Sequence, residues 1–168
     1  MKAALTLYLP TYLTSKGSSI WLAGISLSIL QFSGAGGTFF AGIISDRIGR
    51  KNALLIITLI NPVLMFLFLY VKGIWSIPIL IVTGFFLFGI GPVMLALIHD
   101  INSRHMSFIN GVYMTISFAV SSIFVLLVGY FSDKIGLDTT FRISALVALG
   151  SIPFVLSLKN KTININRE

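Results

Sequence analysis

The chain has 168 residues, of which 56% are hydrophobic and only 10% are charged. Soluble domains carry about 25% charged residues, so this composition excludes a water-soluble fold and makes a lipid bilayer the solvent of the protein. The net charge of +7 does not indicate nucleic-acid binding, because the basic residues lie between apolar runs, and the absence of cysteine excludes disulfides and thiolate metal sites.

The first apolar segment, residues 1–13, is too short to cross a membrane, which takes about 20 apolar residues. A signal peptide is disfavoured, because Pro10 interrupts the run and no cleavage pattern of small residues follows. The segment resembles the outer end of a transmembrane helix whose beginning is absent. We therefore expect a fragment, a split gene product or a chain read from an internal start codon, three alternatives that the sequence leaves open.

Five longer apolar stretches follow, each long enough or nearly long enough to span the hydrocarbon core. None has Asp, Glu, Lys or Arg in its middle, and short connections with turn-forming residues join them. We expect one all-α integral membrane domain over residues 1–168, with a truncated helix at 1–13, five full transmembrane helices and a tail at 159–168. The five predicted spans are residues 21–44, 53–71, 77–98, 108–131 and 141–158.

The basic residues predict the orientation of these spans. Cytoplasmic ends of transmembrane helices are enriched in Lys and Arg, so the richer side is predicted to be cytoplasmic in a cell membrane. This places the loop at residues 46–52 and the C-terminal tail in the cytosol. The richer side holds Arg47, Arg50, Lys51, Arg104, Lys159, Lys161 and Arg167, and the other side holds Lys16, Lys72, Lys134 and Arg142.

The most specific pattern in the chain follows the first full span. It reads Gly42-x-x-x-Asp46-Arg47-x-Gly49-Arg50-Lys51. A glycine at position 42 lets a neighbouring helix approach closely, and Gly49 permits a tight turn. We expect the Asp46 carboxylate to meet the positive N-terminus of the span that begins near residues 108–110.

Arg50 is the residue of this loop that can bind a carboxylate with two parallel hydrogen bonds. Asp100 is the only acidic residue at the cytoplasmic end of the span at 77–98, so we predict that it is the partner of Arg50. A simpler interpretation is that Arg47, Arg50 and Lys51 only anchor the topology.

The pattern at residues 42–51 resembles the signature loop of the major facilitator superfamily, G-x-x-x-D-R-x-G-R-[KR], with every defined position filled. In that family the loop joins the second and third helices of each six-helix half. The resemblance implies half of a twelve-helix transporter, and it implies that Arg50 and Asp100 form a latch that holds the cytoplasmic side closed in one state.

Residues 37–42 and the segment around Asp133 are also similar to the fosmidomycin-resistance branch of the superfamily, a group of drug exporters. The chain departs from that branch at two places. The family often has Gln-Glu near His99 and Asp100, and a proline in the loop that follows, whereas residues 102–105 contain none.

A second copy of the loop pattern ends the span at 108–131. Gly129, Asp133 and Gly136 repeat the spacing of Gly42, Asp46 and Gly49. Three spans separate the two copies, so we expect them on opposite faces of the membrane. This is typical of an inverted repeat of three plus three helices.

Small and polar residues recur on one face of the span at 21–44, at spacings of three and four. The pattern fits the wall of a substrate cavity with Gln31 near its centre, and it equally fits close packing against another helix. Asn61, Asn110 and Ser117 are further candidates for the cavity wall. The face of the first span consists of Gly24, Ser28, Gln31, Ala35, Thr38 and Gly42.

The sequence contains no arrangement typical of an enzyme, a nucleotide-binding loop or a metal site, and no cofactor is expected. Proton coupling, which the resemblance implies, needs an ionisable group inside the membrane, and the five spans offer none. We therefore expect the titrating residues in the missing half or in the missing part of the first helix.

Together with these observations, the resemblance implies the C-terminal half of a secondary transporter that exports a small molecule or drug, with antibiotic resistance as the expected consequence. Its expected partners are the lipid bilayer, an N-terminal half in the same or a separate chain, a small-molecule substrate and protons. The alternative is a non-transporting membrane fragment from a split or decayed gene.

Overall fold

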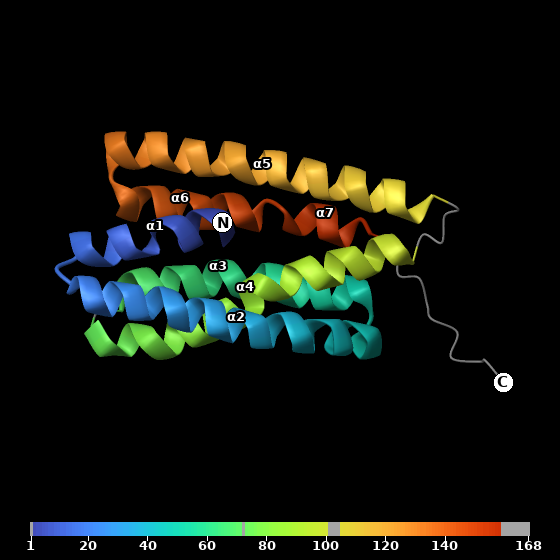
Figure 1. Ribbon diagram of the computed structural model, residues 1–168, viewed down its shortest axis with the longest axis horizontal. Helices are drawn as coiled ribbons and strands as arrows, with labels where there is room; N and C mark the ends of the chain where they lie inside the picture. The colour runs from blue at the N-terminus through green and yellow to red at the C-terminus, as the bar shows by residue number, and fades with distance from the viewer. Residues whose placement is uncertain (1, 72, 101–104, 159–168) are drawn as a thin grey trace.

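Helices account for nearly all of the described chain. The computed structural model describes residues 2–71, 73–100 and 105–158, and no strand occurs within them. Five apolar helical segments are long enough to cross a membrane, which confirms the predicted all-α membrane fold (Figure 1). The helices are α1 (Lys2–Ser15), α2 (Ile20–Ile48), α3 (Arg50–Tyr70), η1 (Gly73–Trp75), α4 (Ser76–His99), α5 (Met106–Ile135), α6 (Leu137–Leu149) and α7 (Ile152–Leu156).

Helices α2 and α5 extend beyond the apolar stretches that predict them. Hydropathy marks only the part of a helix that lies in hydrocarbon, whereas the backbone stays helical through the polar interface until a residue breaks it. In both helices that residue is a glycine with positive φ, Gly49 at 90° and Gly136 at 82°. The signature pattern therefore lies mostly on the last turns of α2.

The last predicted span, residues 141–158, is divided into two helices. α6 ends at Leu149, and the amides of Gly150 and Ser151 bond to carbonyls only three residues back. Glycine is a poor helix former, and Pro153 has no N–H for the ladder, so the helix breaks at this point. The tail at 159–168 lies outside the described residues.

Helices α2 and α4 pack most closely, because glycines on both helices leave no side chain between the backbones. A Cβ added to Gly37 would overlap the backbone of Phe85, and one added to Gly84 would overlap the backbone of α2. At Gly34 the Phe88 ring occupies the space that a Cβ would need, at 2.6 Å. This pair forms the centre of the bundle.

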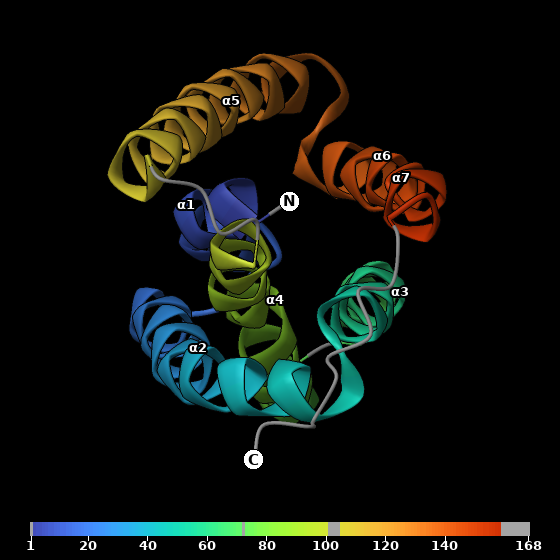
Figure 2. The ribbon, with the colours of Figure 1, turned by 90° about the vertical axis from the view of Figure 1, so that its right-hand side faces the viewer.

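Helix α5 lies apart from this centre. Viewed along the bundle, it occupies one side, with α1 and α6 as its neighbours (Figure 2). Val128 is the only residue of α5 that is buried. The opposite extreme is α3, which buries residues along its whole length against α4, α6 and α7.

Candidate functional site

Arg50 ties together the ends of three helices. A single residue, Gly49, separates α2 from α3, so Arg50 begins α3 and its side chain turns back toward α2. Its Nη1 donates to Ser45 Oγ at 2.7 Å and forms an ion pair with Asp46. Its Nε lies 3.4 Å from Asp100 Oδ2 at the end of α4, so the residues that the sequence pairs do lie together.

Arg50 is the most buried charged residue of this cluster. The Arg50 side chain is only 16% exposed, whereas the Asp46 and Asp100 side chains are 61% and 36% exposed. A largely desolvated cation needs anionic partners, and Arg50 has Asp46 on the preceding helix and Asp100 on α4. The contact to Asp46 spans one helical turn, whereas the contact to Asp100 joins two helices.

Two expectations for the signature loop are not met by this geometry. Asp46 pairs with Arg50 one turn away rather than with the start of α5, because the Gly49 turn brings the guanidinium within reach and α5 packs mainly on α1 and α6. Gly42 has no neighbour within 4 Å of an added Cβ, so it permits no close helix approach among the described residues. That role belongs to Gly34 and Gly37.

The remaining cations of the loop differ in environment. Lys51 Nζ donates to the backbone carbonyl of Leu156 at 2.6 Å, and thereby caps the end of α7. The Arg47 side chain is exposed. Lys51 is therefore more than a topology anchor, because it joins α3 to the last described helix.

The polar face of α2 is uncovered. Ser28, Gln31 and Thr38 are all exposed, and the face that packs against other helices consists of Ala23, Ser26, Leu30, Gly34, Gly37, Ala41 and Ser45. Of the two interpretations of the pattern, close packing thus applies to the adjacent face of the helix. The uncovered face is free to line a space outside this helical unit.

The other predicted cavity residues, Asn61, Asn110 and Ser117, differ in burial and in contacts. Asn61 is 2% exposed, and neither atom of its amide has a partner among the described residues, so the expectation that it lines an open cavity is not met. The side of α3 that carries Asn61 packs against other helices. Asn110 Nδ2 lies 3.1 Å from His99 Nε2, which connects α5 to α4, and Ser117 is half-buried on α5.

The second loop pattern has the same backbone as the first and lies at the other end of the bundle (Figure 1). Gly136 has φ 82° and ψ 153°, against 90° and 144° at Gly49. Ser132 Oγ donates to Gly129 O at 2.8 Å, as Ser45 Oγ does to Gly42 O. The local geometry is thus the one that an inverted repeat requires.

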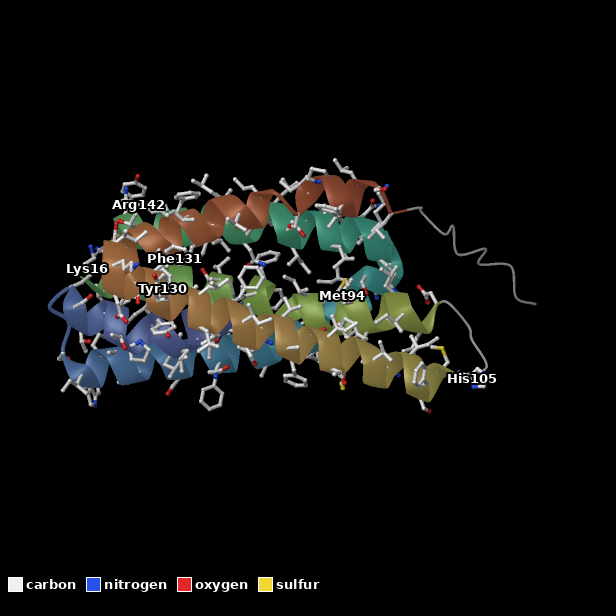
Figure 3. All side chains as sticks on the ribbon, turned by 90° about the horizontal axis from the view of Figure 1, so that it is seen from above. Lys16, Met94, His105, Tyr130, Phe131 and Arg142 are labelled. Atoms are coloured by element: carbon white, nitrogen blue, oxygen red, sulfur yellow. The ribbon has the colours of Figure 1, made fainter. Side chains whose placement is uncertain are left out.

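An ion cluster that sequence reasoning did not identify surrounds Asp138 at this end. Its carboxylate accepts from Tyr12 Oη at 3.1 Å and lies 3.0 Å from Lys16 Nζ and 2.9 Å from Arg142 Nε. Arg142 also lies over the ring of Tyr70, so the cluster joins α1, α3 and α6. Figure 3 shows Lys16 and Arg142 at the same end of the bundle. In the sequence, only the spacing of four residues between Asp138 and Arg142 indicates an ion pair here.

Beside this cluster lies an open cavity of about 430 Å³. It is bounded by α1 on one side and by the end of α5 and the start of α6 on the other. Asp133 lines it, and its carboxylate has no ion pair or hydrogen bond among the described residues. Tyr8, Tyr12, Lys16 and Asp138 also line it.

Comparison with known protein families identifies the fold. The family described as Major Facilitator Superfamily matches residues 2–124, which includes the Arg50 cluster and most of the chain. The chain belongs to this superfamily. Superfamily members are transporters rather than enzymes, and among the described residues no group of three or more His, Asp or Glu residues could hold a metal ion. Neither a curated protein nor a solved structure matches the chain.

Proposed function

We propose that the chain is the C-terminal half of a secondary active transporter, which exports a small molecule by alternating access and is coupled to protons. The ion cluster of Arg50 carries this proposal, because a nearly buried cation shared by carboxylates on two helices can hold one side of the bundle closed and release it when one contact breaks. The loop at 46–52 then faces the cytosol.

The uncovered faces of α2 and α5 support the need for a second half. A polar group without a hydrogen-bond partner is costly in lipid, and α2 presents the Gln31 amide uncovered near its middle. The nearby Ser28 and Thr38 hydroxyls donate to carbonyls of their own helix. A second helical unit placed against this face would shield Gln31 from lipid and leave a substrate path between the halves. Proton coupling then depends on groups outside the spans α2 to α6, which carry no charge in their middle.

Efflux from intact cells tests the transport proposal. Cells expressing the chain together with the reading frame that precedes Met1 should expel at least one of two fluorescent probes, carboxyfluorescein or ethidium, and a protonophore should abolish the efflux. Cells expressing the chain alone should not. If the preceding frame encodes no further spans and neither probe is expelled, the chain is a non-transporting fragment and the proposal is wrong.

Topology is tested separately with single cysteines, since the chain has none of its own. A membrane-impermeant maleimide should label Thr139→Cys in intact cells and Asn52→Cys only in inverted vesicles. Both residues are exposed, and they lie at opposite ends of the bundle, so each is the control for the other. Labelling in the reverse order would place the Arg50 cluster outside the cell.

A further inference from the structure

Lys2 lies at the mid-depth of the bundle. Its Nζ is 4.0 Å from the centre of the Phe88 ring, and Phe88 is at the midpoint of α4. The same ring lies against Gly34, which is the midpoint of α2. Figure 1 agrees, because α1 begins about midway along the bundle.

No other charged residue of the described ranges is so placed. The remaining Lys, Arg and Asp side chains lie near helix ends, at the Arg50 cluster, at the Asp138 cluster or close to them. A charge at the bilayer centre is costly against lipid, and from mid-depth a lysine cannot reach either interface. The Lys2 ammonium must therefore face a polar space between proteins or a water-filled cavity.

Among the described residues, the Lys2 ammonium has no anionic partner. The Lys2 side chain is exposed, and its ammonium lies over the Phe88 ring rather than beside a carboxylate. A cation is thus open to a ligand at mid-depth on this side of the bundle.

We propose that Lys2 binds an anionic solute at mid-depth, whose carboxylate or phosphate pairs with the Lys2 ammonium. The inference rests on the proposed transport function and names the charge of its substrate. The ammonium supplies three hydrogen-bond donors for an oxyanion, and the low dielectric of the membrane interior strengthens the pairing.

Direct binding to the full chain in nanodiscs tests the inference. Reductive methylation with a ¹³C label keeps the lysine charge and gives each lysine an NMR signal, and the Lys2 signal is the one that disappears in Lys2→Arg. Benzoate should shift this signal with saturation, whereas benzamide, which has the same shape without the charge, should not.

Lys134 is the matched control, because its Nζ lies 4.5 Å from the centre of the Tyr130 ring but at the end of α5. Its signal should stay in place. The inference is overturned if the Lys2 signal does not move, if benzamide moves it equally, or if Lys134 moves with it.

The efflux assay separates this inference from the transport proposal. In a working transporter, carboxyfluorescein should be expelled and ethidium retained, and Lys2→Gln should lower carboxyfluorescein efflux at least about tenfold. Lys2→Arg should keep most of it, because arginine retains the charge but cannot release a proton. Ethidium efflux alone would support transport and overturn the anionic substrate. Efflux could be lost in Lys2→Arg even though the unsubstituted chain binds benzoate. That result would show that Lys2 carries a proton rather than only a fixed charge.

Discussion

The turns at Gly49 and Gly136 share a backbone but carry opposite charges. At the first, a cation lies between two carboxylates, and at the second, the Asp138 carboxylate lies between Lys16 and Arg142. A negative charge in the first turn of a helix is favourable, whereas a positive one is not. Asp138 therefore suits the start of α6, while Arg50 begins α3 against the helix dipole and depends on its carboxylate partners. The start of α3 therefore needs its ion pairs more than the start of α6 does.

The largest expected effect is at Arg50. Replacing it by Gln removes the cation that Asp46 and Asp100 share, so the free energy of unfolding in an SDS titration should fall by about 3 kcal/mol. Efflux should be lost as well. The double variant Arg50→Asp, Asp100→Arg restores the pair in reverse and should recover part of both. A double variant no better than Arg50→Asp alone would show that the α3–α4 contact does not matter.

The cluster at the other end should affect stability more than transport. Asp138→Asn removes the anion from Lys16 and Arg142 and should lower the free energy of unfolding by about 2 kcal/mol. The loss is smaller than at Arg50 because the Asp138 side chain is 29% exposed, against 16% for Arg50. Asp133→Asn, in which no ion pair is lost, is the control and should change it by under about 0.5 kcal/mol. Equal losses in the two variants would refute a structural role for the Asp138 cluster.

The shared backbone predicts equal effects at the two glycines. Gly49→Ala and Gly136→Ala each force a side chain into a conformation that almost only glycine adopts, at a cost of about 1–2 kcal/mol. Neither added Cβ meets a neighbour within 4 Å, so the cost is that of the backbone alone. If the two substitutions lowered the free energy of unfolding by markedly different amounts in the same SDS titration, the two turns would not share a backbone conformation.

The smallest expected effect is at Lys51. Lys51→Met keeps the length of the side chain but removes the charge that caps α7, and should lower the free energy of unfolding by about 0.5 kcal/mol. Hydrogen exchange of the amides at residues 152–156 should rise, while exchange in α2 should not change. Unaltered exchange in α7 would show that the cap does not hold this helix.

Much of the fold could be predicted because hydropathy and glycine act locally. The spans follow from apolar runs, and the Arg50–Asp100 contact follows from there being only one acidic residue at that end of α4. The Asp138 cluster could not be predicted, since Tyr12 and Asp138 are 126 residues apart and meet only through the packing of α1 on α6.

Hydropathy also cannot say what covers an apolar or a small polar surface. The pattern on α2 was compatible with packing and with a cavity wall, and the true packing face, which includes Ser26 and Gly34, is a third of a turn or so away. Asn61 shows the same limit, because a polar residue beside a proline can be enclosed by helices as easily as it can face a path for solute.

The isolation of α5 bears on the lifetime of the chain in a cell. A helix that buries only Val128 against its own unit gains little from packing there, and its place depends on what meets it from outside. Left uncovered, α5 is the segment that membrane proteases would extract most easily. The amount of whatever covers this helix would then set how much of the chain accumulates.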